Sequence, residues 1–600
     1  MSSASSSSSA PSASRSASGR SKSPATAKRS KTPPRTPATR ATTRLAKTAK
    51  AKTKAVAVDT ADAEGLGLSA RKPSAARSSK RSTSSSDGNV SGLGHHDLGG
   101  EAQTHEQKQG NKAHEEEMEF GGPWGALGVI LGLPVVIYGL FFLCSQHRCL
   151  HTHHLLSSLH LLPNPSQSFD WDLTTIPTAL FSYEGSLMYL GWFLLCVLLE
   201  RILPGEVVQG AILPAHPLPL TQSAGPTPAG AHRQDRLQYV MSGHLQFWLS
   251  VLLMGHAMPK RTGTEISGLS TGSTSLGSLW ASVGLSGAEA AHFRGFFPLS
   301  LELIYDHYVP LISIAVLFTT LFSIYLYVSS FFLDGHGAPK LLARGGNTGN
   351  CVYDFFIGRE LNPRWGSLDL KQFCELRPGL IGWVVINMGM AAKQLTKTGS
   401  LSMSMVLVNL LQGFYVWDAL YCEKAILTTM DITTDGFGFM LCFGDLAWVP
   451  FIYSLQARYL VDYDPGLSVG ALSGVVAVQL LGYYIFRSAN SQKDAFRRDP
   501  EGESVRHLTF LQTARGTRLL TSGWWGSARK INYTGDWLIT FSWCLLCGGG
   551  SPIPYFQAVY FLVLLVHRAI RDDKMCEEKY GADWAEYKRL VPYWFVPGVI

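Results

Sequence analysis

The residues with the clearest chemical potential lie near the carboxyl end of the chain. Arg529 and Lys530 come before one apolar segment, and Arg568, Arg571 and Asp572 follow the next. Arg568 and Asp572 stand four residues apart, so they share one face if the apolar segment continues as a helix. Guanidinium groups bind phosphate through two parallel hydrogen bonds, which favours an anionic cofactor here. A basic patch that binds lipid head groups is the alternative interpretation.

A second polar cluster contains groups that could donate a proton. It follows an apolar run and comprises Tyr415, Asp418, Glu423 and, further on, Asp431. A partly buried carboxyl or phenol group can be tuned as a proton donor, so this cluster suggests chemistry on a lipid. Lys493 and Arg497, four residues apart, would add positive charge for a phosphorylated cofactor. The structural alternative is that Asp431 or Asp435 caps the start of a helix.

A membrane domain must position these residues, because long apolar runs recur from residue 120 to the carboxyl end. About ten spans result. The runs are residues 124–144, 180–203, 239–258, 309–333, 380–392, 401–420, 437–461, 467–486, 537–546 and 553–566. Several contain Gly, Pro, Asp or Gln, which are tolerated only where the backbone faces protein or a cavity. The sequence therefore predicts an all-α polytopic membrane protein whose helices enclose a pocket.

The first 119 residues have a different composition. Residues 1–110 are mainly Ser, Ala, Lys, Arg, Thr and Pro, and the first aromatic residue of the chain is Phe120. Such a segment cannot bury enough apolar surface to fold, so residues 1–119 are predicted to form a disordered, cytosolic, basic tail. The net charge of +8 comes mostly from this tail. The tail could bind anionic lipid or nucleic acid weakly, or serve only as a solubilising leader.

Neither disulfides nor a metal site are expected from the cysteines. The ten cysteines are scattered, several of them inside apolar runs, and they show no disulfide framework. We therefore expect them to be packing residues. The Cys and His residues within 144–154 match none of the usual zinc-ligand spacings, so no metal is expected there.

Two long motifs resemble the signatures of the membrane sterol reductase family. These motifs are residues 349–364 and residues 565–581. Within the family, residues 358–363, 374–383 and 431–439 are most similar to the delta-14 sterol reductases. The resemblance begins near residue 124 and excludes the tail. It implies a sterol reductase transmembrane domain over residues 120–600, in which residues 487–600 form the cofactor-binding part.

The resemblance also implies an activity. It implies an endoplasmic reticulum enzyme that takes a sterol precursor from the bilayer and reduces its C14–C15 double bond, with NADPH as the hydride source. An alkene accepts hydride poorly, so a proton would first be added at C15, and hydride would then quench the cation at C14. By similarity, the cofactor would be held by Lys493, Arg497, Leu520, Trp525, Asn532, Tyr533, Asp536, Arg568, Asp572 and Tyr580. The region carried over as proton delivery comprises Tyr415, Asp418, Glu423 and Asp431.

Three other functions are compatible with parts of the sequence. Delta-7 or delta-24(28) sterol reductases share the family but differ at the delta-14-like positions. Residues 571–598 are also similar to membrane methyltransferases that act on isoprenylcysteine and would bind S-adenosylmethionine. A nuclear envelope protein that tethers chromatin through its basic tail is the non-enzymatic alternative. The sequence predicts no oligomeric state.

Overall fold

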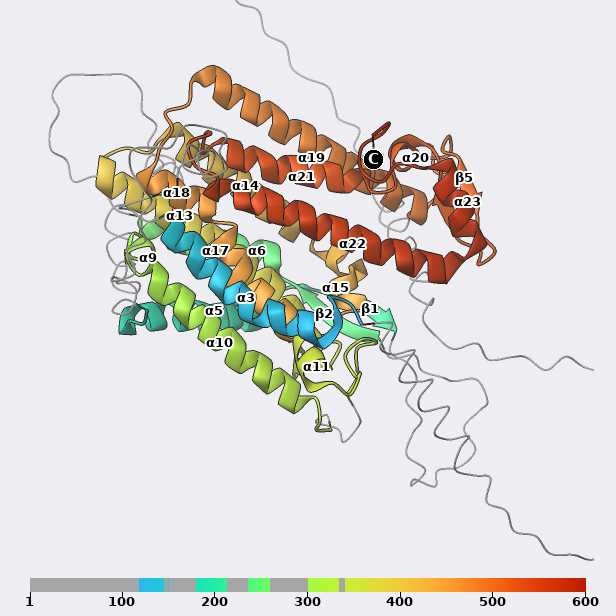
Figure 1. Cartoon of the computed structure of the whole chain (residues 1–600), viewed down its shortest axis with the longest axis horizontal. Coiled ribbons are helices and arrows are strands. Elements are labelled where there is room, and N and C mark those ends of the chain that lie inside the picture. The colour runs from blue at the N-terminus through green and yellow to red at the C-terminus, as the bar shows by residue number, and fades with distance from the viewer. Residues whose placement is uncertain are drawn as a thin grey trace, which may run out of the picture. The chain divides into compact units, whose positions relative to one another are not determined.

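Long helices make up most of the structure (Figure 1). The structure is a computed structural model, and it describes residues 118–144, 149–150, 180–212, 236–258, 300–333 and 340–599. All of these residues belong to one unit of the chain. The predicted tail, up to position 117, lies outside the described residues, as do most of the Cys and His residues within 144–154.

Seven helical segments of the described chain are long and apolar enough to cross a membrane. They are α3 (Gly122–Leu143), α5 (Tyr183–Ile202), α10 (Tyr308–Ser329), α14 (Met403–Tyr421), the run Phe439–Asp462, α19 (Val469–Arg498) and the run Ile553–Tyr580. Their outer faces carry exposed apolar side chains, such as Val135 on α3 and Leu480 on α19. Contiguous apolar surface of this kind is stable against lipid and costly against water. The chain is therefore a polytopic membrane protein.

Three further predicted spans also form helices but are not among these seven. Helices α6 (Gly243–His256) and α21 (Ile531–Leu545) have 14 and 15 residues, which is short of the roughly 20 needed for a full crossing. Helix α13 (Leu380–Thr398) buries polar side chains such as Asn387 and Gln394 among its neighbours. Length and apolarity thus support seven crossings, whereas the sequence predicted about ten.

Shorter elements connect the long helices. They are β1 (Glu206–Ile212), β2 (Arg236–Met241), α9 (Leu303–Asp306), α11 (Cys351–Ile357), β3 (Arg364–Trp365), β4 (Leu368–Asp369), α12 (Leu370–Cys374), η3 (Glu375–Gly379), η4 (Glu423–Thr428), α15 (Met430–Thr433), α16 (Phe439–Phe443), η5 (Gly444–Trp448), α17 (Val449–Ile452), α18 (Leu455–Asp462), β5 (Phe510–Gln512), β6 (Arg518–Leu520), α20 (Gly523–Ser527), η6 (Ile553–Tyr555), α22 (Phe556–Tyr580) and α23 (Ala582–Leu590). The described strands form three separate two-stranded antiparallel hairpins. The core of the described domain is therefore helical.

Serine residues define where several long helices begin. Ser182 accepts a hydrogen bond from the backbone of Gly185 at the start of α5, and Ser402 and Ser468 do the same at the starts of α14 and α19. Such caps satisfy backbone donors that have no partner within the helix. Each of these helices thus begins at a position that its own sequence specifies.

Two of the helices contain a π-helical turn in the interior of the domain. The turn η3 continues α12 into α13 and contains Pro378, and the turn η5 links α16 to α17 just before Pro450. Proline cannot donate the hydrogen bond of a regular helix, which explains why the helical register changes here. The hydroxyl of Tyr189 donates to the backbone oxygen of Leu446, four residues before Pro450, at 3.0 Å.

Helices α19, α21 and α22 run side by side (Figure 1). A Cβ atom at Gly482 of α19 would lie 2.8 Å from the backbone oxygen of Gly535 on α21, and a Cβ at Gly535 would lie 2.6 Å from the backbone nitrogen of Phe486. Only residues without a side chain allow this approach, as in many membrane helix pairs. The contact places the polar second half of α19 beside the polar start of α21.

A small cap closes one end of these three helices, where α20, β5 and α23 gather (Figure 1). Its apolar centre is formed by Phe496, Val505, Leu508, Leu520 and Trp525. The backbone nitrogens of Arg529 and Lys530 donate to the backbone oxygens of Tyr593 and Trp594, at 2.9 and 2.7 Å. The carboxyl-terminal residues are thereby fixed against the start of α21.

The structure corrects one expectation about the cysteines. Cys144 at the end of α3 forms a disulfide with Cys149, five residues later. The two cysteines are only five residues apart, so their bridge closes a short loop and gives no disulfide framework that the sequence would reveal. The hydroxyl of Ser551, just before η6, donates to the backbone oxygen of the adjacent Leu150 at 2.7 Å. The bridge therefore lies at the end of α22 opposite to Arg568.

Candidate functional site

Ion pairs join the second half of α22 to the segment around α15. Arg568 pairs with Asp431, which brings a predicted cofactor-binding residue against a predicted proton-delivery residue. One turn further on, Arg571 binds both oxygens of Asp435, at 2.7 and 3.1 Å, and its Nε lies 2.7 Å from Glu119. Bidentate pairs of this kind fix orientation as well as charge. The polar face predicted for this helix is therefore present and anchored.

Cations from separate elements collect beside this face. The ammonium of Lys493 lies 4.2 Å from the centre of the Trp525 ring. It is within electrostatic range of Arg497, Lys530 and Asp572. Lys530 forms an ion pair with Asp572. This group holds three cations and one carboxylate, and an anionic ligand would relieve the mutual repulsion of the cations.

Two further predicted cofactor-binding residues border this cation group. The side chain of Asn532 donates to Asn490 at 3.3 Å, while its own buried Oδ1 has no hydrogen-bond partner among the described residues. An acceptor left free in this way is available to a donor on a ligand. Tyr533, the next residue, is within electrostatic range of both Lys530 and Arg568.

Leu520, Trp525 and Tyr580 take supporting positions. Leu520 and Trp525 are each 6% exposed and belong to the apolar centre of the cap. The indole nitrogen of Trp525 donates to the backbone oxygen of Ala489 at 2.8 Å, which fixes the ring below Lys493. Tyr580 stacks on Trp584, with 6.3 Å between the ring centres. These side chains form the walls beside the charged groups.

Tyr415 lies with the cofactor-binding residues rather than apart from them. Its hydroxyl donates to Oδ1 of Asp536 at 3.1 Å, and its ring packs against both Trp383 and Trp543. Asp536 lies on α21, one turn after Asn532. The structure therefore brings Tyr415 and Asp431 to the same site as the predicted cofactor-binding residues.

Asp418 and Glu423 are placed elsewhere. Asp418 accepts a hydrogen bond from Tyr483 at 3.0 Å and lies 3.7 Å from Nε of Arg487. Glu423 accepts from Arg377 at 2.6 Å, and it also accepts from Gln372 Nε2 and from the backbone nitrogen of Gly243, both at 2.9 Å. Burial raises the pKa of Glu423, while Arg377 and the backbone donor lower it. A carboxylate with three donors is held in a structural network, so its predicted role in proton delivery stays a prediction.

Several residues at the site were not predicted as site residues. Asn490 on α19 and Asp435 after α15 bind predicted residues directly. Lys530, which the sequence indicated as a cation but not as one of the cofactor-binding residues, is the partner of Asp572. Two more carboxyl groups, those of Glu375 and Asp445, lie within electrostatic range of Asp431. In the sequence, the only signal for these residues is a polar side chain at the border of an apolar run, and Lys530 has this signal. Glu375 and Asp445 lie inside helical runs, where this signal is weak.

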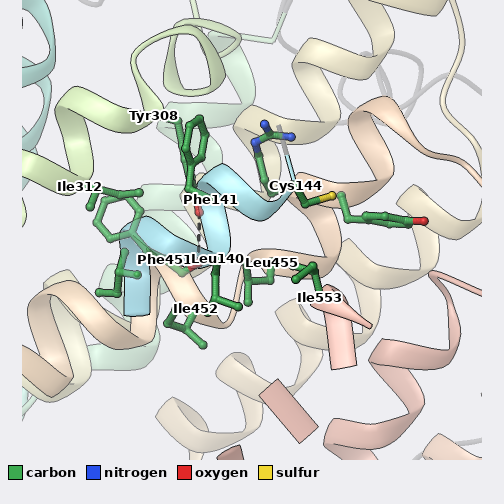
Figure 2. A pocket seen from close by; sticks show the side chains of 12 residues that line it. Leu140, Phe141, Cys144, Tyr308, Ile312, Phe451, Ile452, Leu455 and Ile553 are labelled. Atoms are coloured by element: carbon green, nitrogen blue, oxygen red, sulfur yellow. Dashed lines mark hydrogen bonds between the residues drawn. The ribbon is translucent and has the colours of Figure 1, made fainter. Parts of the chain in front are cut away.

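The recess shown in Figure 2 is separate from this site. It lies between α3, α10, the α17–α18 segment and η6, and it is lined mainly by apolar side chains such as Leu140, Phe141 and Ile312. The hydroxyl of Tyr308 donates to the backbone oxygen of Phe451 at 3.1 Å beside it. None of the predicted cofactor-binding or proton-delivery residues lines this recess.

The fold and the site together define a class of protein: a multi-pass α-helical membrane protein with a cationic site at the carboxyl-terminal end of its domain. The model of the ergosterol biosynthesis ERG4/ERG24 family matches residues 236–600. The chain belongs to this family, as the two sequence motifs predicted.

Relatives with assigned activities are similar over most of the chain. It is 41% identical to the Delta(14)-sterol reductase of Schizosaccharomyces pombe, over 81% of this chain and 98% of that protein. It is 38% identical to the Delta(14)-sterol reductase of Neurospora crassa, over 81% of this chain and 96% of that protein. For the Delta(14)-sterol reductase LBR of Gallus gallus, the identity is 40% over 80% of this chain but only 63% of the relative.

Proposed function

We propose that the chain is a Delta(14)-sterol reductase that uses NADPH. The observation that carries the activity is the similarity to the Schizosaccharomyces pombe enzyme, which is 41% identical and covered over 98% of its length. A reductase of this kind acts on a sterol in the bilayer, which agrees with a site built between membrane helices. The relatives named above carry reductase names, which favours this activity over the methyltransferase alternative.

The residues present fit a phosphorylated dinucleotide. Lys493, Arg497 and Lys530 provide positive charge in excess of Asp572, and Asn532 has a free buried acceptor. Lys493, Arg497 and Lys530 would bind the phosphates, and Asn532 and Tyr533 would contact the neutral parts of the cofactor. NADPH, when bound, supplies a hydride for the reduction.

A residue of the chain must supply the proton that is added to the alkene before the hydride. Protonation at C15 creates a cation at C14, and an acid inside the apolar domain is required for this step. Tyr415 with Asp536, and Asp431 with Arg568, are the predicted proton-delivery residues that lie against the cofactor-binding residues. Exclusion of water by the surrounding apolar helices would protect the cation until hydride arrives.

The orientation in the membrane is part of the proposal. We infer that the Arg568 end of α22 faces the cytosol of an endoplasmic reticulum membrane, since this end carries the cations. The Cys144–Cys149 disulfide at the other end would then face the oxidising lumen. Glu119 pairs with Arg571, so the chain enters α3 from the cytosolic side and the basic tail would be cytosolic. There the tail would bind anionic lipid or nucleic acid weakly.

A direct assay tests the activity. Membranes that contain the protein should convert an 8,14-diene sterol to the 8-ene product when NADPH is added, and the conjugated diene absorbance should fall. The same membranes without NADPH, or with S-adenosylmethionine in its place, provide the control. A folded protein that leaves the diene unchanged would exclude the proposed activity.

A further inference from the structure

The two π-helical turns face each other in the interior of the domain and bring two carboxyl groups together. Glu375 opens the turn η3, and Asp445 is the second residue of η5. A Cβ atom at Gly379 would collide with the backbone oxygen of Asp445, so the turns are as close as glycine permits. Glu375 and Asp445 lie within electrostatic range of each other. π-Helical turns of this kind frequently occur at functional sites.

The carboxyl group of Asp445 is not satisfied by its surroundings. Asp445 is 8% exposed, and its buried Oδ2 has no hydrogen-bond partner among the residues that the structure describes. The indole nitrogen of Trp448, one turn away, is also buried without a partner in that part of the chain. Buried polar atoms are normally paired, so two unpaired ones on one turn point to a group that acts on a ligand or a proton.

The nearby cations are already committed to other groups. Lys371 donates to the backbone oxygens of Asp435 and Ile432, at 2.6 and 3.4 Å, and Arg568 pairs with Asp431. Both cations lie within electrostatic range of Glu375, and Lys371 also lies within range of Asp445, but neither forms an ion pair with these two carboxyl groups. Two carboxyl groups that share a buried site cannot both ionise at low cost. A proton held between the two carboxyl groups would remove the second negative charge.

We propose that Glu375 and Asp445 share a buried proton and that this proton is consumed when the sterol alkene is protonated. The inference rests on the proposed function and assigns the acid that protonates the alkene in it. One carboxyl O–H bond breaks, a C–H bond forms at C15 with the alkene electron pair, and a carboxylate remains. The cation at C14 takes the hydride assigned to NADPH, and the carboxylate later regains a proton from water.

The other acidic groups of the site are less suited to this role. Asp431 is engaged in an ion pair with Arg568. The hydroxyl of Tyr415 is directed to Asp536. Glu375 is within electrostatic range of Arg568 and Asp431, so the pair adjoins the cofactor-binding residues while being paired with neither.

Infrared spectroscopy of the purified full-length protein tests the shared proton without any substrate. A protonated carboxyl gives a C=O band that a carboxylate lacks, so the difference spectrum between wild type and Asp445→Asn at neutral pH should show the loss of one such band. Glu375→Gln should show the same loss. Asp354→Asn is the matched control, because Asp354 is buried but accepts from Thr348 and Gly349. An unchanged band in both pair variants would overturn the proposal.

Turnover tests the use of the proton. Glu375→Gln and Asp445→Asn should lower kcat by about 100-fold or more, the usual contribution of a general acid, with little change in the KM for NADPH. The carboxyl-retaining variants Glu375→Asp and Asp445→Glu should recover part of the activity, which a merely structural role does not predict. Asp445→Asn breaks no hydrogen bond at Oδ2, so it is the variant best placed to fold.

The outcomes separate the two proposals. A wild type that shows the band but reduces no 8,14-diene sterol would contradict the proposed function alone. A wild type that reduces the sterol, with both pair variants equally active, would contradict the proton assignment alone.

Discussion

At the scale of single residues, the site depends on charged groups that hold one another in place. Arg568 is 29% exposed at its side chain and is fixed by Asp431, while Lys530 is fixed by Asp572. Each cation therefore has a set position before any cofactor arrives. Binding then requires little reorganisation, because the charged side chains are already ordered.

Arg568→Gln should weaken NADPH binding by at least about tenfold, since hydrogen bonds to charged groups contribute about 1.5–3 kcal/mol. The variant should still insert in the membrane, because the ion pair lies at the edge of the helical core. NADPH titration of purified protein measures the effect. Arg589→Gln is the control, since Arg589 is 72% exposed and pairs only with Glu586. Unchanged affinity in Arg568→Gln would remove this residue from the cofactor site.

Tyr415→Phe should separate the role of the hydroxyl from that of the ring. The phenyl ring keeps its packing against Trp383 and Trp543, so the melting temperature should change little. The hydrogen bond to Asp536 is lost, and we expect kcat to fall by roughly tenfold or more if Tyr415 takes part in proton delivery. Wild-type turnover would show that Tyr415 serves only packing.

At the scale of elements, the contact between α19 and α21 sets the geometry of the cation group. The contact brings the part of α19 that carries Lys493 beside the start of α21, where Lys530, Asn532 and Asp536 lie. Gly482→Ala places a Cβ 2.8 Å from Gly535, so the helices must separate.

The expected result of Gly482→Ala is a destabilisation of about 1–3 kcal/mol, typical of overpacking, together with weaker NADPH binding. Thermal unfolding and cofactor titration measure the two effects. Gly474→Ala on the same helix is the matched control, because a Cβ at Gly474 meets nothing within 4 Å. Equal behaviour of the two variants would show that this contact does not position the site.

The charged face of α22 could be predicted from the sequence, but the residues that pair with it could not. The spacing of Arg568 and Asp572 defined one helix face, which is a local property. That Asp431 rather than Glu423 would meet Arg568 depends on how α15 and η4 fold back, and spacing carries no such information. The π-helical turns were missed for the same reason. Of the ten spans predicted from apolar runs, seven are long and apolar enough to cross a membrane, and the other three form the shorter or more polar helices α6, α13 and α21.

At the scale of the whole molecule, the described domain has two chemically different ends. One end of α22 carries two ion pairs, Arg568 with Asp431 and Arg571 with Glu119. The other end, near Ser551, adjoins the Cys144–Cys149 disulfide. The difference predicts one orientation, with the cofactor site facing the reducing cytosol where NADPH is available.

Labelling of sealed microsomes tests this orientation. Cys351 is exposed, and the hydroxyl of its helix neighbour Tyr353 accepts from Glu119, which places Cys351 at the Arg568 end. A membrane-impermeant maleimide should label Cys351 without detergent, and Cys351→Ser should lose that label. Labelling that appears only after detergent is added would reverse the proposed topology.

We expect the chain to protonate a sterol alkene at C15 and to transfer hydride from NADPH to C14. The most direct measurement is isotope placement in the product of the purified protein. We predict that NADPH deuterated at the transferred position leaves deuterium at C14, and that unlabelled NADPH in heavy water leaves deuterium at C15. A reduced sterol with both labels from solvent, or no reduction by folded protein, would contradict the account.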